Sequence, residues 1–161
     1  MTAVVASKLR ILVVDDEPSV GNTIKMLLQF DGHEVEATNS SKKALAMFES
    51  GRFDLVFTDF TMPEMNGNQL AAAIKAGAPD QPIVMITAHA GTLPPSPDVD
   101  FVVGKPFRLE HLREAIAKVL PAERRAALVK RTPVYLKPGS SLSILVPHCG
   151  TEAENPKRQT L

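Results

Sequence analysis

The chain has 161 residues, of which 44% are apolar, and its formal net charge is zero. This size fits one domain with an appendage, and the apolar fraction is ordinary for a protein with a buried core. The charge balance excludes the overall positive field that favours nucleic-acid binding. No apolar run is long enough to span a membrane, and no signal-peptide core follows the start. We therefore expect a cytoplasmic protein without membrane insertion.

The charge is distributed unevenly along the chain. Residues 121–161 contain seven Lys or Arg and three Glu, a net charge of +4, so residues 1–120 carry −4. We interpret the basic tail as a solvated extension, with contact to a partner or to nucleic acid as the less favoured alternative. A single cysteine, Cys149, excludes an intrachain disulfide and fits a reducing compartment.

Short apolar runs alternate with helical patterns in the first three quarters of the chain. Such runs are typical of buried parallel strands, and the helices are marked by caps and breakers. In chain order, we predict a strand at 9–14, a helix from Pro18 to the Asp31-Gly32 stop, a strand at 33–38, a helix capped by Ser40 or Ser41 and ended by Gly51, a strand at 54–58, a loop at 62–67, a helix at 70–76, strands at 82–86 and 101–103, and a helix over 109–119 that Pro121 ends. The alternation predicts an α/β fold: a doubly wound parallel sheet with helices on both faces.

One link departs from this alternation. The segment between the strands at 82–86 and 101–103 contains Pro94, Pro95 and Pro97. Three prolines in four positions cannot lie inside an α-helix. The helix expected here is therefore reduced to a turn or lost, and the proline-rich loop at 91–100 takes its place.

The chain changes character after Pro121. Helix formers fill residues 122–130, and apolar segments at 134–136 and 142–146 flank a turn, which is a weak hairpin signal. We expect polar residues 151–161 to be disordered. The whole region is too short and too interrupted by proline for a helix-turn-helix output domain. We therefore divide the chain into an N-terminal extension (1–8), one domain (9–120) and a C-terminal extension (121–161).

Polar groups follow the predicted strands at the point where each strand ends. Asp15 and Asp16 follow the first strand, Asp59 the third, Thr87 the fourth and Lys105 the fifth. In an open α/β sheet, ligands bind at the carboxyl ends of the strands. Three crowded carboxylates favour a bound hard cation such as Mg²⁺, and an opposing lysine can neutralise charge on a phosphoryl group. A carboxylate can itself accept the phosphoryl group, and Asp59 is the best candidate because it lies alone on a central strand.

Four segments carry a resemblance to a known family. They are Val-Val-Asp-Asp-Glu-Pro at 13–18, Asp-Phe-Thr-Met-Pro-Glu-Met-Asn-Gly at 59–67, Met-Ile-Thr-Ala at 85–88 and Gly-Lys-Pro-Phe at 104–107. In this order they closely resemble the receiver domain of bacterial two-component response regulators, of the chemotaxis-receiver type, over roughly 9–120. The resemblance implies a flavodoxin-like five-stranded sheet of order 2-1-3-4-5, for which such a receiver is a standard example. It also implies a single-domain response regulator in a phosphorelay.

The resemblance implies how the acids act. Asp59 accepts a phosphoryl group from a sensor histidine kinase or a histidine phosphotransfer protein. Asp15 or Asp16, together with Asp59 and the backbone carbonyl of Thr61, holds Mg²⁺ or Mn²⁺. The expected chemistry is limited to self-phosphotransfer and slow autodephosphorylation, so the protein is not expected to be a turnover enzyme. A downstream protein partner is implied, but the sequence does not name it.

The resemblance also assigns the switch groups, and here the chain departs from the family pattern. Lys105 contacts the phosphoryl oxygens, Thr87 moves to bond them, and the bond before Pro106 is expected to be cis. Many receivers carry an aromatic switch residue three positions before the lysine, where this chain has Val102. Phe101 is adjacent, but alternation points it to the opposite face. We expect the signal to leave through the first or last helix, or through the tail.

Two alternatives compete with this reading. A receiver fold could serve as a protein-interaction module without a phosphorylation cycle, and Val102 and the missing helix motivate that alternative. A phosphatase of the haloacid dehalogenase type usually has a second acid two residues after the nucleophile, whereas this chain has Thr61 there. The same fold thus accommodates a phosphorylated switch, a constitutive module and, less well, an enzyme.

Overall fold

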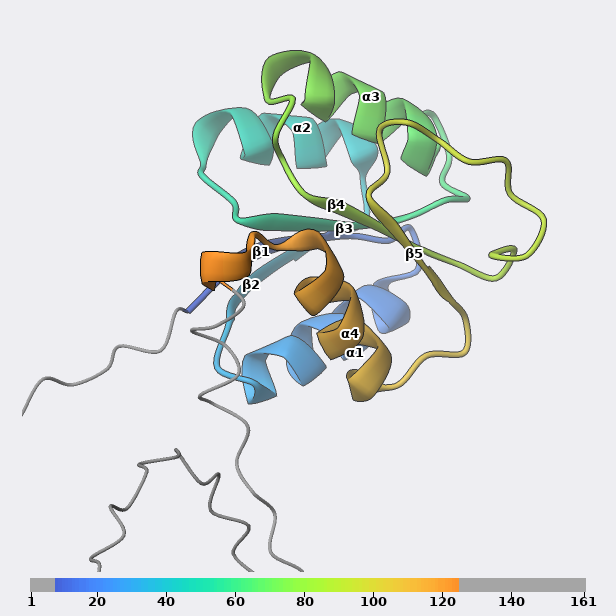
Figure 1. Ribbon diagram of the computed structural model, residues 1–161. Coiled ribbons are helices and arrows are strands. Elements are labelled where there is room, and N and C mark those ends of the chain that lie inside the picture. The colour runs from blue at the N-terminus through green and yellow to red at the C-terminus, as the bar shows by residue number, and fades with distance from the viewer. Residues whose placement is uncertain (1–7, 125–161) are drawn as a thin grey trace, which may run out of the picture.

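The computed structural model describes residues 8–124, in which a five-stranded parallel sheet lies between two layers of helices (Figure 1). The strand order β2-β1-β3-β4-β5 confirms the predicted flavodoxin-like topology. The elements are β1 (Arg10–Val14), α1 (Pro18–Phe30), β2 (Glu34–Thr38), α2 (Ser41–Ser50), β3 (Leu55–Asp59), α3 (Gly67–Gly77), β4 (Ile83–Thr87), β5 (Phe101–Gly104) and α4 (Leu109–Val119). The predicted extensions at 1–8 and 121–161 lie mostly outside the described residues, so these boundaries stay predictions. The same holds for the helical character expected at 122–130, the hairpin expected from 134–136 and 142–146, and the disorder expected at 151–161.

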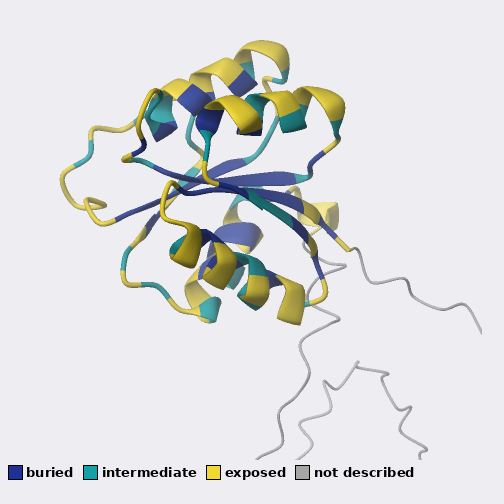
Figure 2. Cartoon of the chain, turned by 180° about the vertical axis from the view of Figure 1, so that it is seen from behind, coloured by how far each residue is buried: buried dark blue, intermediate teal, exposed yellow. Residues whose placement is uncertain are grey.

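The core is divided by the sheet into two clusters. Every residue of β3 and β4 is buried, as continuous apolar strands inside an α/β sheet require. On one face, α1 and α4 pack against a cluster that includes Ile24, Phe57 and Ile116. On the other face, α2 and α3 pack against a cluster that includes Ala44, Leu70 and Ile74. Figure 2 shows buried strands between two layers of helices whose outer faces are exposed. This two-sided burial fixes the central strands and therefore the edge at which they end.

The start of α3 differs from the prediction, which placed it at residue 70. Asn66 and Gln69 form a capping box: Asn66 Oδ1 accepts the Gln69 N–H at 2.9 Å, and Gln69 Oε1 accepts the Asn66 N–H at 3.0 Å. The helix therefore begins at Gly67, three residues earlier. As a result, only residues 60–66 separate Asp59 from the rigid helix.

The link between β4 and β5 contains turns and bends but no helix in the described residues, as the prolines predicted. It forms the long loop that extends from the sheet in Figure 1. Val99 near its end packs against the cluster on the α3 side. Asp100, which directly precedes β5, attaches the end of the link to β4 and α3. Its carboxylate accepts the N–H of Ile83 at 2.8 Å and pairs with Lys75 at 3.0 Å.

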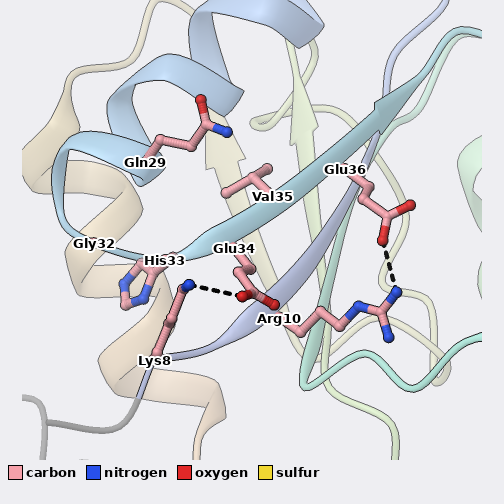
Figure 3. A pocket seen from close by; sticks show the side chains of 8 residues that line it. All are labelled: Lys8, Arg10, Gln29, Gly32, His33, Glu34, Val35 and Glu36. Carbon is pink, nitrogen blue, oxygen red and sulfur yellow. Dashed lines mark hydrogen bonds and ion pairs between the residues drawn. The ribbon is translucent and has the colours of Figure 1, made fainter.

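The other edge of the sheet, β2, is marked by charged side chains. Glu34 pairs with Lys8 at 2.7 Å and Glu36 pairs with Arg10 at 2.8 Å (Figure 3). Both pairs link β2 to the segment that contains β1. Within residues 8–124, no helix combines the length and the apolar character needed to cross a membrane.

Candidate functional site

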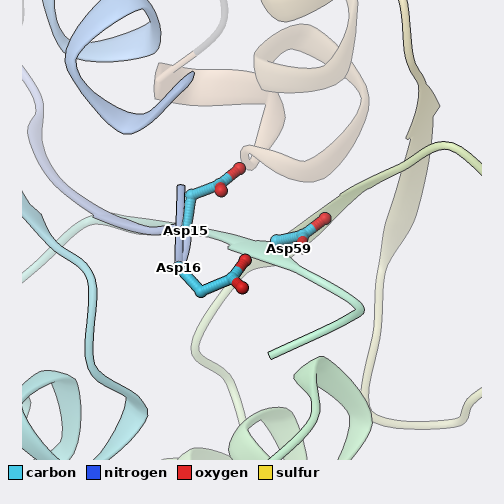
Figure 4. A group of neighbouring side chains, drawn as sticks. All are labelled: Asp15, Asp16 and Asp59. Carbon is cyan, nitrogen blue, oxygen red and sulfur yellow. The ribbon is translucent and has the colours of Figure 1, made fainter. Parts of the chain in front are cut away.

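Three carboxylates meet at the carboxyl ends of β1 and β3. Asp15 and Asp16 follow β1, and Asp59 is the last residue of β3. The two strands are paired with Val14 beside Thr58, so their ends share one edge of the sheet. One carboxylate oxygen of each acid lies within 4.8 Å of the other two (Figure 4). The structure therefore brings together the three acids that the sequence placed at separate strand ends.

Asp15 carries a buried charge. Its exposed fraction is 2%, whereas Asp16 is exposed. Burial raises the pKa of Asp15 above its ordinary value, although the backbone hydrogen bond from Glu17 (2.9 Å) and the charge of Lys105 act in the opposite direction. The nearby charge of Asp59 adds to the increase. The surroundings of Asp15 therefore disfavour the charged form of this carboxyl group.

Lys105 lies between two of the acids. Its Nζ is 3.2 Å from Asp15 Oδ2 and 3.2 Å from Asp59 Oδ1. Burial by itself would lower the pKa of Lys105, but the charges of Asp15 and Asp59 outweigh it and raise that pKa above the ordinary value. The lysine is therefore a fixed cation beside Asp59. The peptide bond from Lys105 to Pro106 is cis, as the resemblance implied.

Thr87 ends β4, the strand next to β3. Its exposed fraction is 1%, and its Oγ1 accepts the N–H of His89 at 3.1 Å. Its backbone carbonyl accepts the N–H of Lys105 at 2.8 Å, which ties the end of β4 to the lysine. Thr87 is thus at the same edge as Asp59, which pairs with Ile86 one residue earlier.

The loop after Asp59 includes Thr61, whose side chain is exposed. Glu64 in this loop has a φ of 68°, a left-handed conformation that is uncommon outside glycine. The loop closes tightly, because the N–H of Gly67 donates to the carbonyl of Phe60 at 2.9 Å. These constraints direct the loop back over the end of β3.

Gly67 was predicted as the end of a loop and ends the segment 59–67 that carries the resemblance, but no positioning role was predicted for it; the structure gives it one. A Cβ at this position would lie 2.3 Å from the carbonyl oxygen of Asp59 and 3.0 Å from Cε of Met85. Only a residue without a side chain lets α3 begin this close to Asp59. The available signal was a glycine that directly follows the Asn66 cap.

The departure at the aromatic switch position is visible in the structure. Val102 is exposed, with an exposed fraction of 41%, whereas Phe101 packs partly buried against the cluster on the α1 and α4 side. Alternation along β5 thus puts Phe101 on the opposite face from Val102, as predicted. No aromatic side chain occupies position 102, three residues before the lysine.

The donors of this site suit a hard divalent cation. The three acids offer oxygen atoms alone, which is the ligand type that Mg²⁺ prefers. Lys105 supplies one positive charge against three carboxylates, so a cation of higher charge would relieve their repulsion. The acid cluster of this chain therefore fits a divalent metal ion.

Comparison with known proteins agrees with this geometry. A family model for the response regulator receiver domain matches residues 11–117. The chain belongs to this family. It thus contains a receiver domain of the kind found in response regulators of two-component systems. The resemblance that the four segments carried is confirmed.

Curated relatives of the receiver are regulatory proteins. The transcriptional regulatory protein GlrR of Escherichia coli is 33% identical over 79% of this chain and 31% of its own length. The response regulator MprA of Mycolicibacterium vanbaalenii is 33% identical over 77% of this chain and 52% of its own length. The chain spans about half or less of the length of these relatives.

Solved structures of receivers match the whole fold. The response regulator TrrA of Thermotoga maritima, in complex with Mg²⁺ and BeF, is 37% identical; 71% of this chain and 100% of that chain are covered, with a TM-score of 0.65. The chemotaxis response regulator CheY4 of Vibrio cholerae is 30% identical with the same coverage and a TM-score of 0.64. TrrA in complex with the histidine kinase ThkA is 36% identical, with 71% and 100% coverage and a TM-score of 0.65.

Proposed function

We propose that this receiver accepts a phosphoryl group on Asp59 and acts as a phosphorylation-dependent switch for a protein partner. The observation that carries this proposal is the position of Lys105 Nζ, 3.2 Å from Asp59 and 3.2 Å from Asp15. A fixed cation beside a buried carboxylate is suited to charge that develops on a transferring phosphoryl group. Asp15, which also contacts Lys105, and Asp16 lie beside Asp59 in the acid cluster.

The transfer needs a nucleophile, a leaving group and charge neutralisation. An oxygen of Asp59 attacks the phosphorus of a phosphohistidine; the P–N bond breaks, and its electron pair stays on the imidazole nitrogen, which takes up a proton. Lys105 neutralises the phosphoryl oxygens, and Asp15 or Asp16, together with Asp59 and the backbone carbonyl of Thr61, would hold Mg²⁺ or Mn²⁺. A bound divalent ion would supply further charge neutralisation at those oxygens.

Thr87 is the candidate switch group. Its hydroxyl can donate to a phosphoryl oxygen on Asp59, because both side chains lie at the carboxyl ends of adjacent strands. The hydroxyl now accepts the N–H of His89, so a turn toward the phosphoryl group would alter the start of the proline-rich loop. Such differential contact to the phosphorylated state is what a two-state switch requires.

The expected donor is a sensor histidine kinase or a histidine phosphotransfer protein. Support comes from the related receiver TrrA, which has been solved in complex with a histidine kinase. We further propose that this receiver acts in the cytoplasm, because its single cysteine, Cys149, fits a reducing compartment. Its only expected catalysis acts on its own phosphoryl group.

Mass spectrometry of the intact protein tests phosphorylation directly. With acetyl phosphate and Mg²⁺, the wild-type chain should gain the mass of one phosphoryl group, and chelation of the metal should prevent the gain. The Asp59→Asn variant should show no gain. Asp80→Asn is a matched control, because Asp80 is an exposed acid outside the cluster. An equal gain in Asp59→Asn, or no gain in wild type, would refute the proposal.

A second candidate function is a phosphorylation-independent interaction module. It is favoured by the exposed Val102 and by the link without a helix. This alternative requires that partner binding is the same in wild type and Asp59→Asn, with and without phosphodonor. The switch requires that binding changes with phosphodonor in wild type alone. A binding titration with an identified partner distinguishes the two.

A further inference from the structure

The two edges of the sheet are protected differently. On β2, Glu34 and Glu36 form ion pairs with Lys8 and Arg10, so charges line this edge (Figure 3). Charged side chains on an edge strand hinder the addition of another strand. These charges therefore hinder the pairing of a further strand with β2.

The β5 edge has no such protection. Its sequence is Phe-Val-Val-Gly, without charge or proline, and Val102 is 41% exposed. The preceding link has no helix that could cover the strand. A groove of about 230 Å³ lies along β5 and is lined by all four of its residues together with His111 and Glu114 of α4. An apolar edge beside an open groove is the arrangement to which an extended segment adds a strand.

The backbone pattern shows which groups face this edge. The N–H of Val56 in β3 donates to the carbonyl of Pro82, so even-numbered residues of β4 direct their backbone N–H and C=O groups toward β3. The odd-numbered residues of β4 therefore direct these groups toward β5. The carbonyl of Thr87 accordingly accepts the N–H of Lys105. Phe101 and Val103 lie four and two residues before Lys105, so their backbone N–H and C=O groups point toward β4 as well. The N–H and C=O of Val102 and Gly104 therefore point to the free edge.

We propose that residues 142–146 of this chain pair with the free edge of β5 as a sixth strand. Their sequence, Leu-Ser-Ile-Leu-Val, is apolar apart from Ser143 and contains the β-branched residues Ile144 and Val146, which favour strands. The segment has five residues, one more than the four of β5. The segment also belongs to a region of net charge +4, whereas Glu114 lines the groove.

The segment can reach the groove easily. Arg124, the last described residue, pairs with Asp54, which directly precedes β3. The chain therefore leaves the domain two strands away from β5, a distance of about 10 Å across the sheet. The intervening residues 125–141 could span up to about 56 Å if extended, at about 3.3 Å per residue. A tethered segment also binds at an effective concentration of about millimolar.

This contact would link the C-terminal extension to the phosphorylation site, which goes beyond the proposed switch itself. Gly104 directly precedes Lys105, whose Nζ contacts Asp59. A strand bonded to Gly104 would also cover Val102 at the position of the missing aromatic residue. The extension would thus occupy the surface that the absent helix leaves open.

Amide hydrogen exchange of the full-length chain, resolved residue by residue, tests the contact. The Val102 amide should exchange slowly in wild type. In Ile144→Pro the added strand loses a hydrogen-bond donor and its extended pairing, so exchange at Val102 should become at least about tenfold faster. The Val103 amide faces β4 and should not change, which reports an intact domain. Glu152→Pro, outside the segment, is the matched control and should behave like wild type.

Two outcomes would overturn the proposal. Equal Val102 exchange in wild type and Ile144→Pro would show that residues 142–146 do not cover the edge. Protection that persists in Ile144→Pro and grows with protein concentration would show that a second copy covers it instead. Both outcomes would leave phosphorylation of Asp59 unaffected, so they are distinguishable from failure of the proposed function.

Discussion

At the scale of single residues, the acids explain why the site needs a cation. Asp15 is buried, its pKa is raised, and its carboxylate is close to that of Asp59. An acid whose pKa is higher in the folded than in the unfolded state costs folding free energy once it is ionised in both. This penalty is absent at low pH, where Asp15 is protonated in both states, and appears as the pH rises through its pKa. Function, rather than stability, therefore accounts for the cluster.

The Asp15→Asn substitution should accordingly stabilise the metal-free protein. At neutral pH we expect the free energy of unfolding to rise by about 1 kcal/mol, because a buried carboxylate is replaced by a neutral group that can still accept the Glu17 N–H. Mg²⁺ should stabilise wild type and have little effect on the variant. Urea unfolding with and without Mg²⁺ measures both effects. A less stable variant with an undiminished response to Mg²⁺ would contradict this account.

Gly67 is the second position where one residue controls the site. A methyl group there must displace the carbonyl of Asp59, which lies 2.3 Å from the added Cβ. We expect Gly67→Ala to slow phosphorylation by acetyl phosphate roughly tenfold to a hundredfold, because small misplacements of reacting groups have large effects. It should also lower the free energy of unfolding by about 1–3 kcal/mol.

A matched control for Gly67→Ala lies in the same helix. A Cβ at Gly77 would meet no atom within 4 Å, so Gly77→Ala should leave the phosphorylation rate unchanged. It should stabilise the protein slightly, if at all, through helix propensity. Time courses of intact mass compare the two variants. Similar rates in both would show that the close approach of α3 does not position Asp59.

At the scale of elements, the link without a helix depends on its anchor at Asp100. The carboxylate of Asp100 accepts the N–H of Ile83, a buried residue, and pairs with Lys75. Asp100→Ala should lower the free energy of unfolding by about 1–3 kcal/mol, because a buried donor loses its partner. Lys75→Met removes only the ion pair and should cost less than about 1 kcal/mol. Urea unfolding measures the loss of stability in each variant. Equal losses in Asp100→Ala and Lys75→Met would mean that only the ion pair, and not the hydrogen bond to Ile83, holds the link in place.

The elements themselves were predictable where the pattern was local. Apolar runs located four of the five strands, and the prolines at 94, 95 and 97 correctly removed one helix. The strand predicted at 33–38 forms as β2, although its sequence is not an apolar run. The start of α3 was missed because the reciprocal bonds of Asn66 and Gln69 require both side chains to fold back on the backbone. The first turn of α3, residues 67–69, contains no apolar side chain, so the helical spacing of apolar residues began only at Leu70 and the helix was predicted to start there.

At the scale of the whole molecule, parallel pairing explains why the site could be read from the sequence. Strand ends at Asp15, Asp59 and Thr87 meet at one edge once the order 2-1-3-4-5 is set. The position of Lys105 Nζ between two acids and the clearance at Gly67 depend on side-chain packing across distant segments. No periodicity encodes such contacts, so they could be found only in the folded structure.

A phosphoryl group on Asp59 is proposed to switch this receiver. Hydrogen exchange with and without Mg²⁺ and beryllofluoride tests it most directly, since a related receiver was solved in complex with Mg²⁺ and BeF. In wild type, exchange should change around Thr87 and Lys105 and also in α1 or α4, and Asp59→Asn should show no change. Identical exchange in wild type with and without the mimic would contradict the switch. Changes confined to residues 91–100 would contradict the proposed route of the signal through a helix.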